Sequence, residues 1–495
     1  MRMRSEAYLP VLAACLLLPA ASGQSLDQRI AAVLEAPAAK RASWGILAVR
    51  VADGAVLYER NARVPMTPAS NTKLVSTALA LVRLGPEYRF LTRVLAPEAP
   101  DEQGRLRGDL RLVGGGDPTL SGRAVPYSKD AKEGDPLGPL GELADRVVLR
   151  GVRVIDGDIV GDATRWPWEP YPAGWAVGDM TWEYGAPVSA LTVNDSAVRL
   201  SVRPGKAEGE PAAVEFLPPL EPFTVHNTLR TRAGAERRIE VARAPGSSVL
   251  EIRGLAPPGS GAAVQWVAVP DPAQFAAEAF ALLLRQRGVV IRGRARGLTR
   301  APGAPWSEPQ GVELARRESP PLVELARIVN KVSQNLHAEM LLRETAHVVR
   351  GEGTARAGTE EMAALLKEAG AEEKEFDLED GSGLSRRGLL SASTLTALLR
   401  HMEARGLGEL FRSLLPVAGG DGTLSGRFRG MADAAAIRAK TGSLSHVTAL
   451  SGYAGDDPAR RVAFSILVNG YTAPASEARA LADKIAVEIL RESQR

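Results

Sequence analysis

Three short polar motifs in this chain place side chains that could carry acyl-transfer chemistry. The first is Ser70-Asn71-Thr72-Lys73. Residues three apart on a helix share a face, so the hydroxyl of Ser70 and the amine of Lys73 can come within hydrogen-bond distance. A serine becomes a nucleophile when a base takes its proton, and a lysine can be that base if burial or a second cation lowers its pKa. By itself the motif is weak, because about two such pairs arise by chance in a chain of this length.

The second motif is Ser333-Gln334-Asn335, at the centre of a helix that apolar periodicity predicts over Glu324 to Ala346. Serine and asparagine are unfavourable in the middle of a helix because their side chains compete with backbone hydrogen bonds. A break of this kind indicates side chains turned inward for a purpose. A simple polar helix face is the alternative.

The third motif, Lys440-Thr441-Gly442-Ser443, directly precedes a predicted strand. The charge of Lys440 and the hydroxyl of Thr441 suit a carboxylate, and Gly442 would let another backbone, such as a substrate strand, approach closely. An exposed lysine in a strand-entry turn is the alternative. The order of the three motifs, each in its expected context, matches the signature of β-lactamases and penicillin-binding proteins.

The spacing of the motifs narrows the choice within that superfamily. Ser70 and Ser333 are 263 positions apart, more than a compact β-lactamase has room for. The chain resembles the D-alanyl-D-alanine carboxypeptidase/endopeptidase family, the low-molecular-mass class C penicillin-binding proteins. Further blocks carry the same resemblance, and they are Leu84 to Phe90, Gly114 to Pro118, Val188 to Asp195, Asp380 to Arg386 and Gly420 to Leu424.

This resemblance implies a role for each motif residue. Ser70 is expected to be the acylated nucleophile and Lys73 its general base. Ser333 is expected to relay a proton to the leaving D-alanine, and Asn335 to hold the substrate amide. Lys440 and Thr441 are expected to bind the terminal carboxylate, and the backbone N–H groups of Ser70 and Ser443, after the close approach at Gly442, to form the oxyanion hole.

Members of this family also bind the free amino-acid end of the peptide stem. The residues expected to do so here are Asp179 and Arg386, with Leu444 and Ser445 lining the same pocket. Lys73 and Lys440 would both face the small site, and their mutual repulsion is expected to lower the pKa of Lys73 towards neutrality. No cofactor or metal is expected. The implied partners are peptidoglycan stem peptides and β-lactam antibiotics.

The elements that must position these residues follow from periodicity and composition. Residues 44–60 predict a β-hairpin that turns at Asp53-Gly54, and a helix with Thr67 as its cap and Pro68 in its first position is expected to carry Ser70. The chain from about 90 to 315 is rich in Gly, Pro and short β-like runs, with one amphipathic helix at Pro272 to Arg287. Strands Val447–Ala454 and Arg461–Asn469 and a helix Ser476 to Arg491 end the chain.

The resulting expectation is an α/β fold, in which a β-lactamase/transpeptidase-like domain, an antiparallel sheet flanked by helices, is interrupted by a β-rich insertion of two nested smaller domains. The expected segments are a signal peptide (1–23), the two parts of the transpeptidase-like domain (24–90 and 316–495), the two parts of the first insertion domain (91–190 and 266–315) and the nested domain (191–265).

Composition fits an exported protein. Arg2 and Arg4, an apolar run from Leu9 to Pro19 and small residues before Gln24 predict a secretory signal peptide, hence the periplasm or cell envelope. The single cysteine, Cys15, lies in that signal; lipoprotein anchoring through it is the less favoured alternative. The net charge is only +3, from 61 basic and 58 acidic residues, which gives no reason to expect nucleic acid. No transmembrane segment is expected after cleavage, and the oligomeric state stays open.

Other motifs support the interpretation by their absence. The sequence contains no Gly-x-Ser-x-Gly elbow, no His-Glu-x-x-His and no Gly-x-x-x-x-Gly-Lys loop. His337, two residues after Asn335, is interpreted as a helix-packing residue. Two alternative functions remain, a β-lactamase or esterase using the same chemistry and a non-catalytic protein that binds peptidoglycan. Rapid turnover of penicillin favours the first, and failure to be labelled by penicillin favours the second.

Overall fold

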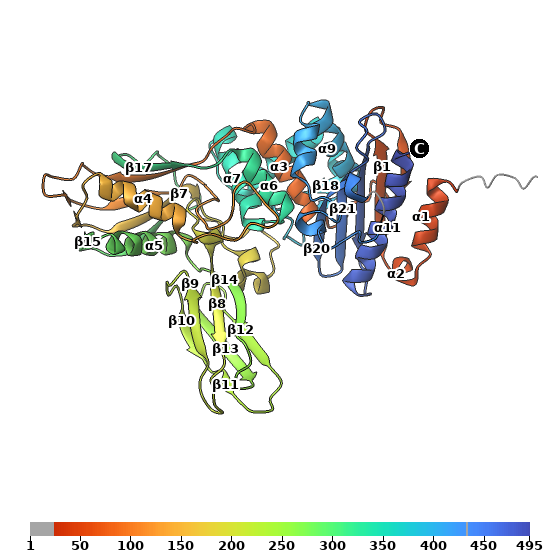
Figure 1. Cartoon of the computed structure of the whole chain (residues 1–495). Coiled ribbons are helices and arrows are strands. Elements are labelled where there is room, and N and C mark those ends of the chain that lie inside the picture. The colour runs from red at the N-terminus through yellow and green to blue at the C-terminus, as the bar shows by residue number, and fades with distance from the viewer. Residues whose placement is uncertain (1–23, 432–433) are drawn as a thin grey trace, which may run out of the picture.

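The two ends of the chain meet in one five-stranded antiparallel sheet (Figure 1). The computed structural model describes residues 24–431 and 434–495, so the predicted signal peptide and Cys15 lie outside the described residues. In sheet order the strands are β2 (Val56–Arg60), β1 (Ser43–Arg50), β22 (Val462–Asn469), β21 (Val447–Ala454) and β20 (Ile437–Leu444). The hairpin predicted over residues 44–60 is confirmed as β1 and β2.

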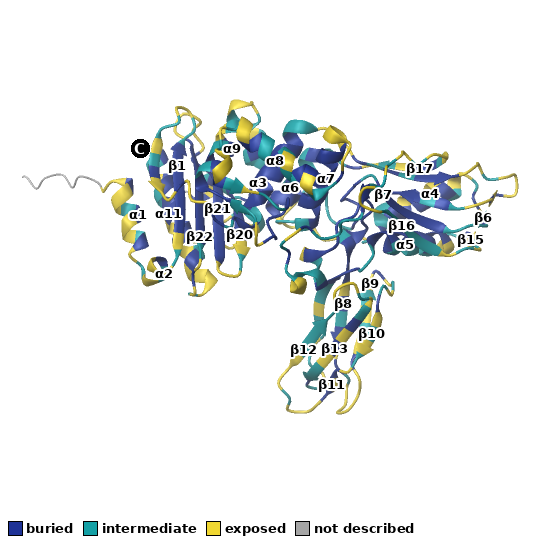
Figure 2. Cartoon of the chain, turned by 180° about the vertical axis from the view of Figure 1, so that it is seen from behind, coloured by how far each residue is buried: buried dark blue, intermediate teal, exposed yellow. Residues whose placement is uncertain are grey.

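Helices cover both faces of this sheet, so β21 is buried along its whole length and the central strand, β22, is buried up to its last residue. One face packs against helices from the two chain ends, α1 (Leu26–Leu34), α2 (Pro37–Lys40) and α11 (Ala475–Ser493). The other face packs against the helical layer α3 (Thr72–Arg83), α6 (Leu322–Lys331), α7 (Asn335–Arg350), α8 (Ala355–Glu368), α9 (Ala392–Ala404) and α10 (Gly408–Leu414). Figure 2 shows the buried strands and the exposed outer faces of the helices. The expected antiparallel sheet flanked by helices is confirmed.

The single helix predicted over Glu324 to Ala346 is wrong in one respect. The chain forms two helices, α6 and α7, which are separated by Val332-Ser333-Gln334. Ser333 has a φ of 64°, a left-handed conformation that no residue inside an α-helix adopts. Apolar periodicity continues across the break, which is why the sequence reads as one helix.

The insertion leaves the helical layer after α3 and builds a second sheet. Its strands, in sheet order, are β16 (Ala295–Arg300), β7 (Ile159–Pro167), β5 (Leu110–Val113), β3 (Leu91–Ala96) and β17 (Val312–Glu318). A small sheet of β15 (Val290–Ile291), β6 (Val154–Ile155) and β4 (Arg105–Leu106) lies beside it. Two helices belong to this region, α4 (Gly138–Leu149) and α5 (Pro272–Gln286). The sequence predicts only α5, because two glycines and a proline in the first turn of α4 resemble a loop.

A further β unit, residues 197–268, projects from the insertion (Figure 1). Its strands form two sheets; one holds β14 (Ala263–Ala268), β8 (Ala197–Arg203) and β9 (Ala213–Leu217), and the other holds β10 (Thr224–Asn227), β11 (Arg230–Thr231), β12 (Arg238–Ala242) and β13 (Val249–Ala256). A short pair, β18 (Phe376–Asp377) and β19 (Leu389–Leu390), brackets the loop that reaches the site described below. Among the helices of residues 24–431 and 434–495, none combines the length and apolar character that crossing a membrane requires.

Candidate active site

Ser70 lies in a tight turn that packs against the five-stranded sheet and is hydrogen-bonded to it. The turn is a 3-10 helix, η1 (Ala69–Asn71), and α3 begins only at Thr72, so the prediction that Pro68 starts a regular helix with Thr67 as cap is wrong. Ala69 has a φ of 48°, and Asn71 Nδ2 donates to Ser451 Oγ of β21 at 2.6 Å. A strained residue persists where its surroundings fix it, and such residues gather at functional sites.

Lys73 meets Ser70 as predicted. Its Nζ donates to Ser70 Oγ at 3.0 Å, to Asn335 Oδ1 at 2.6 Å and to the carbonyl of Ser382 at 2.6 Å. The side chain has no exposed surface, and this burial lowers the pKa of Lys73 to about 7, although the Asp380 and Glu339 carboxylates oppose the shift. The direction agrees with the sequence prediction, but its main cause is desolvation and not repulsion from Lys440.

Ser333 and Asn335 occupy the break between α6 and α7. The left-handed backbone at Ser333 turns its side chain towards β20, and Asn335 opens α7. The amide of Asn335 accepts from Lys73 through Oδ1 and donates through Nδ2 to the carbonyl of Tyr184 at 2.8 Å. Asn335 therefore links Lys73 to a backbone segment of the insertion.

Lys440 completes the convergence of the three motifs. Its Nζ donates to Ser333 Oγ at 2.9 Å and to its neighbour's carbonyl, Thr441 O, at 2.8 Å. Burial, with the charge of Lys73 adding to it, holds the pKa of Lys440 well below its usual range. Thr441 Oγ1 donates to Thr423 Oγ1 at 2.7 Å, which brings to the site a threonine that the motifs do not include.

The structure gives a reason for glycine at position 442 that differs from the predicted one. A Cβ on Gly442 would lie 2.6 Å from the carbonyl oxygen of Pro68 and 3.1 Å from the side chain of Ala69. The backbone that approaches Gly442 is thus the turn of the protein itself that carries Ser70. Gly383 serves the same turn from the other side, with a φ of 73° and a place for Cβ only 1.9 Å from Ala69 O.

Two buried carboxylates near Lys73 lie outside the three motifs. Glu339 Oε1 accepts from the backbone N–H groups of Gly381 and Ser382 at 3.0 and 2.8 Å. Asp380 accepts from Ser382 Oγ, Gly383 N and Ser385 N. Burial, assisted by the charge of Asp380, raises the pKa of Glu339 to about 7. The sequence signal for Glu339 is its place one turn after Asn335 on an otherwise apolar helix face.

Asp179 and Arg386 lie at the outer edge of the site. Asp179 is in the 3-10 helix η2 (Val177–Thr181); its Oδ1 accepts from the phenol of Tyr184 at 3.3 Å, and its buried Oδ2 has no partner among the described residues. Burial and Asp179 raise the pKa of Tyr184 to about 12, while Arg386 lowers it, so both predicted residues act on Tyr184. Arg386 itself is exposed.

The end of β20 lines the same edge. Ser443 and Ser445 are exposed, and Leu444 is half-buried against apolar side chains of the insertion. Trp175 is tied to the site by its indole N–H, which donates to Asp380 Oδ2 at 2.9 Å. His337 is buried, as expected of a packing residue, but its ring also bonds Asp195. This second contact has no sequence signal, because Asp195 lies 142 positions away.

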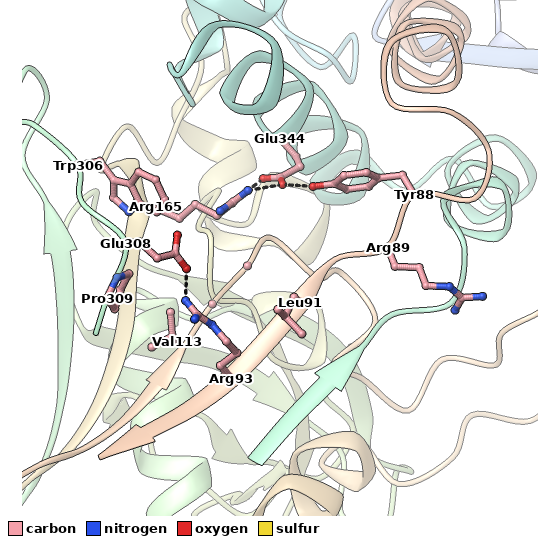
Figure 3. A pocket seen from close by; sticks show the side chains of 12 residues that line it. Tyr88, Arg89, Leu91, Arg93, Val113, Arg165, Trp306, Glu308, Pro309 and Glu344 are labelled. Atoms are coloured by element: carbon pink, nitrogen blue, oxygen red, sulfur yellow. Dashed lines mark hydrogen bonds and ion pairs between the residues drawn. The ribbon is translucent and has the colours of Figure 1, made fainter. Parts of the chain in front are cut away.

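A cavity of about 200 Å³ lies elsewhere, where α7 meets the insertion (Figure 3). Glu344, Arg165, Tyr88 and Trp306 line it, and its lining includes none of the motif residues. Within residues 24–431 and 434–495, His, Asp and Glu side chains form no group of three that could hold a metal ion.

The chain matches a protein-family model over residues 26–491, that of the D-Ala-D-Ala carboxypeptidase 3 (S13) family. It is 35% identical to a D-alanyl-D-alanine carboxypeptidase of Actinomadura sp. (strain R39), over 97% of this chain and 88% of the relative. It is 26% identical to the D-alanyl-D-alanine carboxypeptidase DacB of Haemophilus influenzae, over 86% of this chain and 85% of that relative.

A solved structure shares the fold. Penicillin binding protein 4 (dacB) from Haemophilus influenzae superposes with a TM-score of 0.80 at 24% identity, over 94% of this chain and 98% of that one. The arrangement of a helix-flanked antiparallel sheet with a β-rich insertion is therefore the β-lactamase/transpeptidase-like fold of that protein.

Proposed function

The chain belongs to the D-Ala-D-Ala carboxypeptidase 3 (S13) family and is a serine-type D-alanyl-D-alanine carboxypeptidase, and on this premise we propose how its residues perform the reaction. Ser70 is the nucleophile, Lys73 the base, and Ser333, Asn335 and Lys440 complete the catalytic group. The observation that carries the proposal is the convergence on Lys73 Nζ of Ser70 Oγ at 3.0 Å and Asn335 Oδ1 at 2.6 Å, from motifs far apart in the chain.

Acylation begins with the transfer of the Ser70 hydroxyl proton to neutral Lys73. Because burial lowers the pKa of Lys73 to about 7, a substantial fraction of the amine is neutral near physiological pH. Ser70 Oγ then bonds to the carbonyl carbon of the penultimate D-alanine. The backbone N–H groups of Ser70 and Ser443 stabilise the resulting oxyanion, a contribution worth about 3–4 kcal/mol in other serine hydrolases.

Departure of the terminal D-alanine needs a proton on its nitrogen. Ser333 Oγ supplies it and takes a proton from Lys440, whose Nζ lies 2.9 Å away. Lys73 releases to solvent the proton that it took from Ser70, and Lys440 regains one from solvent, so both amines return to their starting states. Lys440 and Thr441 bind the terminal carboxylate, and Thr423 supports Thr441 through their 2.7 Å hydrogen bond. Water then attacks the acyl-enzyme, which breaks the ester bond and returns the proton to Ser70.

The same chemistry cuts a cross-link when the leaving amine belongs to a neighbouring stem peptide, so we propose DD-endopeptidase activity as well. Asp179 and Arg386 bind the free amino-acid end of the stem, with Leu444 and Ser445 beside them. The buried, unpartnered Oδ2 of Asp179 supports this, because a buried carboxylate oxygen is favourable only when it meets a donor such as an ammonium group. Asp179→Asn should raise KM for stems with a free amino group and leave KM for blocked stems unchanged.

We further propose the domain boundaries and the location. Strand pairing supports segments 24–90 and 319–495 as one domain, 91–190 and 269–318 as a second, and 191–268 as a third nested in it. The boundaries expected at 265/266 and 315/316 are moved because β14 pairs with β8 up to Ala268 and β17 pairs with β3 up to Glu318. The signal-like residues 1–23 direct export, and a periplasmic location fits a substrate in the cell wall. Blocking signal cleavage by replacing Ala21 and Gly23 with bulky residues should leave an uncleaved precursor on a gel.

The test of the mechanism is intact-protein mass spectrometry after incubation with benzylpenicillin. Wild type should gain the mass of one penicillin, and Ser70→Ala should gain none. Ser76→Ala is the matched control, because Ser76 is a buried serine of α3, the helix that follows the Ser70 turn, and it donates to Gly381 O, outside the proposed catalytic group. It should be acylated like wild type.

Purified muropeptides separate the two activities. Wild type should release D-alanine from pentapeptides and split cross-linked dimers, and Ser70→Ala should do neither. Penicillin labelling that persists in Ser70→Ala would overturn the assignment of the nucleophile. Rapid, repeated turnover of penicillin by wild type would instead support a β-lactamase.

A further inference from the structure

Three consecutive residues of the insertion have a strained backbone next to the active site. Asn194, Asp195 and Ser196 have φ values of 51°, 55° and 52°, in the left-handed region. Non-glycine residues rarely adopt it, and a run of three is sustained only where the surrounding structure fixes it. Strain of this kind indicates a functional constraint on the segment.

The strain delivers the Asp195 carboxylate to a set of donors. Its Oδ1 lies 2.8 Å from His337 Nε2, and its Oδ2 accepts from Gln334 Nε2 at 3.2 Å and from Arg123 Nε at 3.2 Å. Burial raises the pKa of Asp195, but Arg123 and His337 outweigh it and hold that pKa below its usual range. An ionised carboxylate only accepts hydrogen bonds, so His337 Nε2 carries the proton.

Two of these donors belong to the turn that carries the second motif. Gln334 stands between Ser333 and Asn335, and its Oε1 caps α7 by accepting from Leu336 N at 2.9 Å. His337 lies in the first turn of α7. The backbone at Ser333 is itself left-handed, so local preferences do not hold the turn, and contacts from outside must do so.

We propose that Asp195 is a positioning residue of the reaction: through Gln334 and His337 it fixes the turn that presents Ser333 to Lys440 and Asn335 to Lys73. The insertion thereby sets the geometry of a catalytic group to which it contributes no reacting atom. The proposal rests on the roles given above to Ser333 and Asn335. An ionised hydrogen bond is suited to this task, because charge-assisted bonds are roughly twice as strong as neutral ones.

A cavity of about 320 Å³ beside Asp195 allows a test by chemical rescue. Asp195 and Arg123 line it, together with Glu183, Arg199 and Trp266. The carboxylate is therefore reachable by a small solute from a space outside the catalytic group. If the side chain is removed, a free carboxylate such as formate can take its place against Arg123, Gln334 and His337.

The first experiment removes the charge and keeps the shape. Asp195→Asn suits the left-handed backbone, because asparagine tolerates it as well as aspartate does. The second-order rate constant for acylation by penicillin should fall about 10- to 100-fold, the range for hydrogen bonds to a charged group. With a peptide substrate, kcat should carry most of the loss and KM little of it.

The matched control is Asp162→Asn. Asp162 is a fully buried carboxylate of β7, paired with Arg111 and accepting from Thr164, and it has no contact with the Ser333 turn. It should lower the melting temperature without lowering the acylation rate. A loss of acylation as large as that of Asp195→Asn would show a general effect of destabilising the insertion, and would overturn the proposal.

The second experiment is chemical rescue. Asp195→Gly removes the side chain at no cost to the left-handed backbone, and formate should restore acylation by about tenfold or more, acetate less and butyrate not at all. Wild type and Ser333→Ala should not respond to formate. Asp195→Asn that acylates within twofold of wild type, or Asp195→Gly that formate does not rescue, contradicts the proposal. Neither result touches the proposed nucleophile, which fails if Ser70→Ala is still acylated.

Discussion

Helix α7 carries two buried clusters of ionisable side chains, and they differ in how each charge is partnered. At its first turns, Asn335 and Glu339 face Lys73. Lys73 is bonded only to neutral groups, the Ser70 hydroxyl, the Asn335 amide and the Ser382 carbonyl. The nearest carboxylates, Asp380 and Glu339, bond to backbone N–H groups and to a hydroxyl and an indole, and not to the amine.

Glu344, five residues after Glu339 on α7, is partnered by opposite charge. Arg165 donates to both of its carboxylate oxygens, at 2.9 and 2.7 Å, and Tyr88 donates at 2.6 Å (Figure 3). Trp166 adds a longer contact of 3.3 Å. Burial, and then the neighbouring Glu344 charge, raise the pKa of Tyr88, so the phenol keeps its proton.

The difference shows what buried charge is used for in this molecule. A buried group with neutral partners changes protonation easily, because desolvation penalises its charged form and nothing opposes the penalty strongly. A buried group with an ionised, bidentate partner keeps its charge and holds two parts of the structure together. The Lys73 cluster is thus suited to proton transfer, and the Glu344 cluster to joining α7 to the insertion.

The largest effect is expected from Lys73→Arg. Arginine keeps a buried positive charge but cannot give up its proton at accessible pH. Acylation by penicillin should fall about 10²- to 10⁴-fold, the usual contribution of a general base. Stopped-flow or quenched-flow labelling measures the rate, and thermal unfolding confirms that the variant is folded. Acylation within tenfold of wild type would show that Lys73 is not the base.

Glu344→Ala should act on stability where Lys73→Arg acts on rate. Removing one partner of a buried ion pair leaves Arg165 uncompensated, at a cost of about 3–5 kcal/mol. The melting temperature should fall clearly, while the acylation rate of the folded fraction stays within about threefold of wild type. Differential scanning fluorimetry and penicillin labelling below the transition measure the two. Arg165→Ala together with Glu344→Ala should cost less than the sum of the single variants.

The pH dependence follows from the lowered pKa of Lys73. The base must be neutral, so the acylation rate should rise with pH and reach half of its limit near pH 7 in the free enzyme. The measurement is the second-order rate constant for penicillin from pH 5 to 9, with a thermal scan at each pH. A profile that is flat across this range would mean that Lys73 is already neutral at pH 5, or is not the base.

Glu339→Gln should have the smallest effect on acylation, and it tests directly how a nearby carboxylate changes the pKa of Lys73. Glutamine can still accept from Gly381 and Ser382 through its oxygen, but it removes a negative charge that opposes the lowering of the Lys73 pKa. The rising limb of the pH profile should therefore move to lower pH, by less than about one unit. Glu361→Gln, which changes an outer carboxylate of α8, should leave the limb in place. A shift to higher pH would mean that Glu339 does not act on Lys73 by its charge.

The residues that we propose as catalytic could be identified in the sequence because they lie in short motifs. Ser70 and Lys73 are three residues apart, and a helical turn is enough to bring them together. Glu339 and Asp195 could not be predicted in the same way. Glu339 acts through Ser382, and Asp195 acts through Gln334. In each pair the two residues lie on different elements and far apart in the chain, so no short sequence spacing reveals the contact.

The same distinction applies to backbone conformation. The sequence predicts a close approach at Gly442, but the neighbour is Pro68, which only the packing of β20 against the Ser70 turn reveals. The left-handed backbone at Ser333 ends α6, although apolar periodicity continues to α7. Periodicity reports which face is buried and does not report whether the helix is continuous.

What this sequence determines by itself is a set of reactive groups and the local elements that carry them, since both depend on residues a few positions apart. Only the tertiary structure decides which of those groups is charged and where it points, because desolvation and charge pairing arise when segments hundreds of residues apart pack together. Burial among neutral partners lowers the pKa of Lys73 to about 7, and burial against Arg165 lets Glu344 link α7 to the insertion.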